Sequence, residues 1–269
     1  MADLINTALD KPFLLFWGPP MSGKTVLATQ FPKPTLINLD KNLNSVMALR
    51  AKYGLSFNFR VFTIDESPTE DPEFLSLCGA NFGKLMPWEK FKKIVEVLGR
   101  KMDKDETLII DSITRAGEYL VRYLIKITGH KPLQIQDWGT YVDEFQTFTD
   151  SVKTSACKPM VILIGHDRFD KMEGSGDWRR TLIIPTSARD RIPSIVTESL
   201  YMKIDIRGSS TNRKVKRILQ SLPDPVTTSG SRSLMPDIEY PTYAKMRPYL
   251  EAGAGYSLGE PTWTPPVDE

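Results

Sequence analysis

A phosphate-binding pattern near the start of the chain constrains its fold more than any other feature. The pattern G-x-x-x-x-G-K-T directly follows the apolar run 13–17 and comprises Gly18, Pro19, Pro20, Met21, Ser22, Gly23, Lys24 and Thr25. A buried strand that turns tightly into a helix presents free backbone N–H groups to phosphate oxygens, and glycines permit the tight turn. The pattern therefore predicts a nucleotide-binding P-loop.

Two side chains of the P-loop have expected chemical roles. The ammonium group of Lys24 should reach the β and γ phosphates, and the hydroxyl of Thr25 should ligate Mg²⁺. The chain contains no N-K-x-D segment that would read guanine. ATP with Mg²⁺ is therefore the expected ligand.

Two strand-end carboxylates are candidates for the rest of the site. The apolar run 108–110 ends at Asp111, which we expect to hold the Mg²⁺ shell. The predicted strand 35–39 ends at Asp40, the candidate base that orients the attacking water. Each carboxylate could instead cap the helix that follows it. Asp40 is one methylene shorter than Glu, and a displacement of about 1 Å can cost on the order of 100-fold in rate.

A third polar residue follows the apolar strand predicted at 160–165. His166 is the candidate sensor of the γ-phosphate. The alternative is a strand-end histidine that only bonds to a loop. Lys24, Asp40, Asp111 and His166 together form the predicted catalytic set.

Short apolar runs separated by helical patterns indicate an α/β fold with a mostly parallel central sheet flanked by helices. Strands are predicted at 13–17, 35–39, 60–64, 108–111 and 160–165, and helices at 88–98, 113–127 and 141–152. Further strands are predicted at 181–184, 200–206 and 215–219, and a short helix at 242–250. An AAA+ module would continue into a helical lid, so these extra strands favour a RecA-like core. We assign residues 1–222 to that core and 223–269 to an extension with a flexible Pro-rich tail.

Composition excludes several classes of protein. The formal net charge is +2, so any nucleic-acid contact must come from a local patch. Cys78 and Cys157 form no C-x-x-C pair, which argues against a disulfide framework or a zinc site and fits a cytoplasmic protein. The sequence has no apolar run long enough to span a bilayer, so no membrane association is expected.

Two loops and one basic cluster carry residues suited to other partners. Candidate DNA-binding residues are Lys131 and Trp138 in the loop 128–139, and Arg168, Phe169, Lys171, Trp178, Arg179 and Arg180 in the loop 167–180. Acidic residues dilute the second loop, which could be an ordinary solvated loop, and Trp138 could be a packing anchor. Lys216 and Arg217 lead a set of candidate cations that would complete a neighbouring subunit's site. The same basic cluster could be only a solvated strand edge.

The order of P-loop, Asp40, Asp111, the strand ending at His166 and a glycine-containing loop resembles RecA over residues 13 to about 220. It is most similar to short phage-encoded single-strand annealing recombinases, which look alike around residues 136–139. The resemblance implies an ATPase stimulated by single-stranded DNA, working as a homo-oligomeric ring or filament in the host cytoplasm. It also implies a single-strand-binding protein or another replication protein as a partner. In RecA-like proteins a Glu usually stands at the place of Asp40.

Other functional classes remain open from the sequence. A helicase loader or motor ATPase would act on a protein partner, and the nearly neutral charge is compatible with it. A small-molecule kinase is a weaker alternative, because no Arg-rich lid follows the P-loop helix.

Overall fold

The computed structural model describes residues 11–55, 59–67, 71–154, 156–171, 176–185, 188–207 and 214–265. The strands are β1 Phe13–Gly18, β2 Pro34–Asn38, β3 Arg60–Thr63, β4 Thr107–Asp111, β5 Met160–Lys171, β6 Trp178–Leu182, β7 Glu198–Arg207, β8 Lys214–Gln220, β9 Gly230–Ser231 and β10 Ile238–Glu239. The helices are α1 Lys24–Ala28, α2 Asn44–Tyr53, α3 Pro72–Cys78, α4 Pro87–Lys101, α5 Ile113–Thr128, α6 Ile135–Lys153, α7 Ala188–Ile195 and α8 Tyr243–Ala254, with a 3-10 turn, η1, at Phe82–Lys84.

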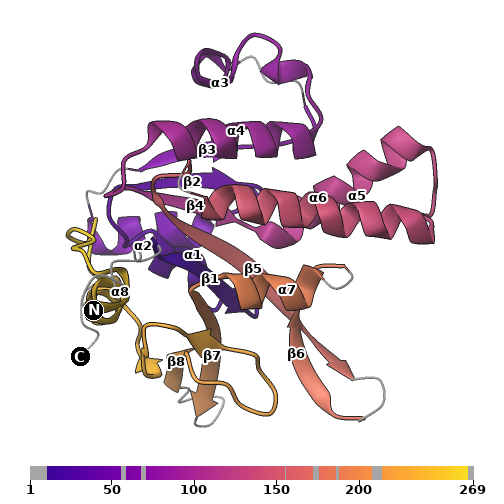
Figure 1. Ribbon diagram of the computed structural model, residues 1–269. Coiled ribbons are helices and arrows are strands. Elements are labelled where there is room, and N and C mark those ends of the chain that lie inside the picture. Colours follow the sequence, from indigo (N-terminus) through magenta and orange to yellow (C-terminus); the bar gives the residue numbers. More distant parts are fainter. Residues whose placement is uncertain are drawn as a thin grey trace, which may run out of the picture.

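A single sheet organises these elements (Figure 1) in the order β10-β8-β7-β1-β5-β4-β2-β3. All neighbours from β7 to β3 are parallel, whereas β8 and β10 add antiparallel strands at one edge. The predicted α/β class with a mostly parallel sheet is therefore confirmed. Because parallel strands end at the same edge, the residues at the C-terminal ends of β1, β2 and β4 meet there, next to His166 within β5.

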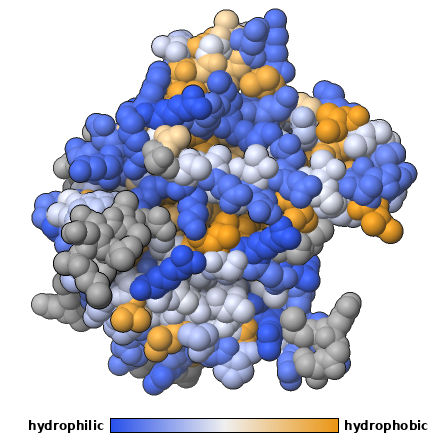
Figure 2. Space-filling view, in the orientation of Figure 1, coloured by the Kyte–Doolittle hydropathy of each residue, from blue (hydrophilic) through white to orange (hydrophobic). Residues whose placement is uncertain are grey.

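The two faces of the sheet bury separate apolar cores. Alternate residues of β1 point to opposite faces, so Trp17 joins the core under α4, α5 and α6, whereas Phe16 joins the core under α1 and α8. Burial of both faces explains why the central strands read as continuous apolar runs in the sequence. Figure 2 shows a largely hydrophilic surface on one side of the molecule, with apolar residues in separate patches.

The C-terminal extension packs on the sheet and helices that precede it. Ile238 and Met246 share one apolar cluster with Leu14 of β1. Farther along, the Thr262 amide donates to the Gln30 carbonyl at 2.9 Å, and Trp263 is buried. In the described residues, the extension beyond position 222 thus belongs to the same packed body, and the Pro-rich tail is held against it through Trp263. Residues 266–269 lie outside the described part.

Both expected loops contain more regular structure than the sequence indicated. Helix α6 begins at Ile135, because the Asp137 carboxylate accepts the Gln134 amide at 2.7 Å and caps the first turn. Strand β5 continues to Lys171 and pairs with β6. The predicted loop 167–180 is therefore a β-hairpin, of which residues 172–175 lie outside the described part. No helix among the described residues is long and apolar enough to cross a membrane.

Candidate functional site

The P-loop backbone requires glycine at its two ends. Gly18 has φ 141°, and a β-carbon there would lie 2.7 Å from the carbonyl oxygen of Met202 on β7. Gly23 has φ 101°, a conformation that L side chains rarely adopt. The loop therefore wraps closely against β7 and enters α1 in the geometry that the sequence pattern predicts.

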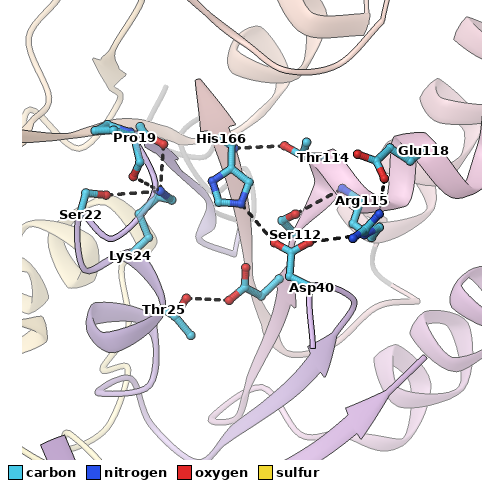
Figure 3. Close-up of polar contacts among 12 residues, drawn as sticks. Pro19, Ser22, Lys24, Thr25, Asp40, Ser112, Thr114, Arg115, Glu118 and His166 are labelled. Atoms are coloured by element: carbon cyan, nitrogen blue, oxygen red, sulfur yellow. Dashed lines mark hydrogen bonds and ion pairs between the residues drawn. The ribbon is translucent and has the colours of Figure 1, made fainter. Parts of the chain in front are cut away.

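Lys24 is buried inside the loop that it belongs to. Its Nζ donates to the carbonyls of Gly18 at 2.9 Å and Pro19 at 2.7 Å, and to the Ser22 hydroxyl at 3.3 Å (Figure 3). Burial lowers the pKa of Lys24 to about 8, although nearby carboxylates oppose this shift. The ammonium group is thus desolvated, and the phosphates of a nucleotide would stabilise its charged form.

Thr25 and Asp111 converge at the edge of the sheet. The Thr25 hydroxyl donates to Asp111 Oδ2 at 2.6 Å. Burial raises the pKa of Asp111 to about 6, and the charge of Asp40 adds to this effect. A divalent cation between the hydroxyl and the carboxylate would offset this cost, so the pair fits Mg²⁺. No cluster of three or more acidic, His or Cys side chains suited to a metal occurs in the described residues, so phosphate and water oxygens would complete the shell.

Asp40 is held by three groups at the mouth of the site. His166 Nε2 lies 3.1 Å from Asp40 Oδ2, and Arg115 Nε lies 3.8 Å from Oδ1 (Figure 3). Burial alone would raise the pKa of Asp40. Hydrogen bonds with His166 and Ser112, together with the charge of Arg115, outweigh burial and hold that pKa below its usual value. Asp40 is therefore ionised at neutral pH, as a water-orienting carboxylate must be.

A cavity of about 350 Å³ joins these groups. It is lined by residues from the P-loop, α2 and the strand ends, among them Lys24, Thr25, Asp40, Asp111 and His166. The structure thus brings together all four members of the predicted catalytic set. Sequence reasoning missed Arg115, Asn42 and Ser45. Arg115 stands three residues after Ser112, whose side chain accepts the Arg115 amide as a helix cap. This spacing could have shown from the sequence that Arg115 lies in the first turn of the helix that follows Asp111.

The β5–β6 hairpin carries the second group of predicted residues. The rings of Phe169 and Trp178 stack with centroids 5.2 Å apart, and both side chains are about half exposed. Strand register places Lys171 opposite Trp178, so it lies on the same face. Arg180 is on that face as well, 5.3 Å from the Phe169 ring, where its guanidinium donates to Asp167 at 2.7 Å.

The opposite face of the hairpin differs in character. Arg168 donates to Asp170 at 2.6 Å, so its charge is locally neutralised. Arg179 is exposed and lies opposite Asp170 in the strand register. Six of the predicted DNA-binding residues are therefore on one hairpin, but they divide between two faces.

The connection between α5 and α6 lies at the far end of this helix pair, away from the β5–β6 hairpin (Figure 1). Lys131 is exposed in the connection between the two helices. Trp138 is in the first turns of α6, partly buried, with its ring 5.7 Å from that of Tyr141. Trp138 thus acts as a packing residue, and the structure does not join these two residues to the hairpin surface.

The two leading candidates for a cation acting between subunits both contact other residues of this chain. Lys216 forms an ion pair with Glu239 on β10. The Arg217 side chain lies against Gly23, because a β-carbon on Gly23 would be 3.5 Å from Arg217 Cδ and Nε. Arg217 therefore approaches the P-loop of its own subunit.

One family of known proteins matches this chain. No curated protein matches the chain. Among solved structures, the chain is similar to a prototypical ATPase from the type III secretion system of pathogenic bacteria, at 14% sequence identity and a TM-score of 0.44. The match covers 76% of this chain and 60% of the other. The sequence profile of the family described as AAA domain matches residues 10–233, which include the P-loop, both carboxylates and the hairpin. The chain therefore belongs to the AAA domain family of P-loop ATPases.

Proposed function

We propose that this P-loop ATPase is a DNA recombination protein that binds single-stranded DNA and promotes annealing or strand pairing. The observation that carries the proposal is the stacked Phe169–Trp178 pair, half exposed on a hairpin that projects from the sheet edge beside the nucleotide site (Figure 1). Apolar groups that lie together on an exposed surface often mark an interaction site. Single-stranded bases offer flat surfaces that stack on such rings, at about 1–3 kcal/mol per base.

The charges around the pair suit a nucleic-acid backbone. Lys171 and Arg180 flank the rings on the same face, and Arg179 is exposed on the other. Cations beside stacking platforms neutralise phosphates, and the released counterions make such binding dependent on salt. The overall charge of +2 is then no obstacle, because the contact is local.

The hairpin is physically connected to the nucleotide site. His166 and Asp167 are neighbours on β5, where His166 faces Asp40 in the cavity and Asp167 binds Arg180 at the base of the hairpin. Asp167 also contributes to the electrostatic environment of Lys24. A nucleotide that displaces His166 or Lys24 would therefore also affect Asp167, which holds Arg180 next to the Phe169 ring. By this route ATP would control DNA binding.

In this proposal the chain's residues divide the work of hydrolysis. Lys24 binds the transferred phosphate, Asp40 orients the attacking water, and His166 responds to the presence of the γ-phosphate. Mg²⁺, held through Thr25 and Asp111, would neutralise charge on the phosphate oxygens. The protein would assemble as a homo-oligomer and, in keeping with the resemblance to phage recombinases, would work in the host cytoplasm with a replication protein as partner.

The test is binding of fluorescent single-stranded DNA with and without ATP, at several salt concentrations. ATP should tighten binding, the affinity should fall steeply with log[salt], and Lys24→Ala should abolish the effect of ATP. Phe169→Ala and Trp178→Ala should each weaken binding, whereas Tyr240→Ala, an exposed aromatic on another part of the surface, should not. Equal affinity with and without ATP would refute the proposal.

A second candidate function is a helicase loader or motor that acts on a protein partner. It is favoured by the internal neutralisation of the hairpin, where Arg168 pairs with Asp170 and Arg180 with Asp167. In that case the aromatic pair would contact protein, and DNA affinity would be weak and nearly independent of salt.

A further inference from the structure

We propose that Arg217 binds the phosphate groups of nucleotide held by its own subunit. The proposal rests on ATP being the ligand of the P-loop, and it concerns the same site. Cations that complete the sites of ring-forming or filament-forming NTPases come from a neighbouring subunit. The structure points instead to an arginine within the same chain.

The β7–β8 pair forms the wall that brings Arg217 to the loop. The carbonyl of Met202 on β7 packs against Gly18 at the start of the P-loop. Arg217 on β8 lies opposite Ile204 of β7, which is two residues beyond Met202. The Arg217 side chain reaches Gly23 at the other end of the loop. The backbone of β8 is fixed there, because the Arg217 carbonyl accepts the Tyr240 amide at 2.8 Å.

Arg217 differs from its neighbour on β8 in having its charge available. Lys216 is engaged with Glu239. Within the described ranges, no hydrogen bond or ion pair involves the Arg217 guanidinium, and the residue is exposed. An arginine whose aliphatic part touches a phosphate-binding loop and whose charged end is unpaired can turn toward an anion in that loop at little conformational cost.

The charge balance of the site leaves room for such a cation. Asp40, Asp111 and Asp167 all act electrostatically on Lys24, the one lysine of the P-loop. Arg115, the guanidinium that lines the cavity, is already tied to Asp40 and Glu118. A triphosphate adds further negative charge to this group of carboxylates. The guanidinium of Arg217 would supply the missing positive charge in bidentate form.

The first test is nucleotide affinity in the absence of DNA, measured with a fluorescent ATP analogue and its diphosphate counterpart. Arg217→Ala should bind the triphosphate about 10- to 100-fold more weakly, because a charge-assisted hydrogen bond is lost. Arg217→Lys should retain part of the affinity, since lysine keeps the positive charge but lacks the paired N–H donors of a guanidinium group. The matched control is Lys214→Ala, which removes an exposed cation from the same strand and should change affinity by less than about threefold.

These outcomes separate the inference from the proposed function. If the unmodified protein binds no nucleotide, the ATP-dependent function fails. If it binds ATP and Arg217→Ala binds equally well, only the role of Arg217 is overturned. Unchanged melting temperatures would show that Arg217→Ala is folded, and Arg217→Lys remains informative if it is not.

A mixing experiment distinguishes action within a subunit from action between subunits. Lys24→Ala protein keeps Arg217 but should not bind nucleotide, and Arg217→Ala protein keeps the P-loop. If Arg217 acts within its own subunit, an equal mixture should bind the triphosphate no better than Arg217→Ala alone. Recovery of tight binding in the mixture would show that the arginine acts on a neighbour, and would overturn the proposal.

Discussion

The His166 Nε2 atom lies 3.1 Å from Asp40 Oδ2, although 126 residues separate the two positions in the chain. Parallel pairing of β5 with β4, and of β4 with β2, brings them to one sheet edge. The His166 imidazole holds the Asp40 carboxylate in place. The Asp40 side chain is one methylene shorter than the Glu that is usual at this place in RecA-like proteins. A short side chain held by a ring and by Arg115 has few alternative positions, so its orientation is set before substrate arrives.

The first prediction concerns Asp40 as the group that orients water. Asp40→Asn keeps the size and a hydrogen bond to His166 but loses the charge, so ATP hydrolysis should fall about 100-fold or more while ATP binding persists. Steady-state hydrolysis and a separate binding titration measure the two effects. Asp65→Asn is the control, because Asp65 is an acidic residue paired with Lys41 at the surface. Hydrolysis at the unmodified rate in Asp40→Asn would exclude this role.

The second prediction concerns the protonation of Lys24. Its pKa in the free protein is lowered to about 8, and a bound phosphate stabilises the ammonium form. Binding therefore requires proton uptake above that pH, and ATP affinity should fall by up to about tenfold per pH unit as pH rises beyond 8. Titrations from pH 7 to 9.5 measure this. In Lys24→Arg, which stays protonated, any remaining affinity should not show this decline, and a similar decline there would assign it to another group.

The third prediction concerns the cost of burying Asp111. Its pKa is raised from 3.8 to about 6, so between these values the folded protein binds more protons than the unfolded chain. Stability should therefore fall as pH rises from about 4 to about 6 and carry the full cost above that range. At about 1.4 kcal/mol per pH unit the cost is about 3 kcal/mol.

Asp111→Asn should remove this cost. Without nucleotide, it should be more stable than the unmodified protein at pH 7, with the difference vanishing near pH 4, although the metal site is lost. Denaturant unfolding at several pH values measures both statements. A variant less stable at pH 7 would mean that the carboxylate is not electrostatically disfavoured.

The fourth prediction concerns the coupling between Phe169 and Trp178. Because the rings stack on each other, removing either one should also disturb the platform presented by the other. The double variant should then lose less DNA-binding free energy than the sum of the two single variants, by about 0.5–1.5 kcal/mol. Fluorescence anisotropy on single-stranded DNA completes this double-mutant cycle. Strict additivity would indicate that the two rings bind independently.

The strands β1, β2 and β4 and the first half of β5 could be predicted because they are buried on both faces and are therefore largely apolar. The P-loop was equally clear, since Gly18 and Gly23 are required by backbone conformations that other residues rarely adopt. Parallel topology also predicts that Asp40, Asp111 and His166 lie close together, but β5 continues past His166 to Lys171, so His166 is not at a strand end.

Other features depend on contacts between distant residues. The β5–β6 hairpin was read as a loop because its outer residues are polar or half exposed on both faces, so no apolar alternation marks its strands. The orientation of Arg217 toward Gly23 follows from the β7–β8 register, which sequence does not specify. The tail was expected to be flexible on its Pro content, whereas Trp263 anchors it on Val46.

The last prediction concerns that anchor. Trp263 is 7% exposed, packs on Val46 and lies with its Nε1 3.4 Å from the Thr29 hydroxyl just after α1. Trp263→Ala should therefore lower the free energy of unfolding by about 3 kcal/mol. Because Val46 lines the nucleotide cavity, ATP affinity should fall as well.

Two comparisons make this prediction specific. Trp263→Phe keeps apolar packing and should recover most of the stability. Leu234→Ala removes an apolar side chain from the same extension, but that side chain is 86% exposed and its loss should have little effect. Thermal melts and ATP titrations of the three variants would measure both quantities. If Trp263→Ala unfolds like the unmodified protein, the tail does not support the P-loop helix, and the extension is dispensable for the nucleotide site.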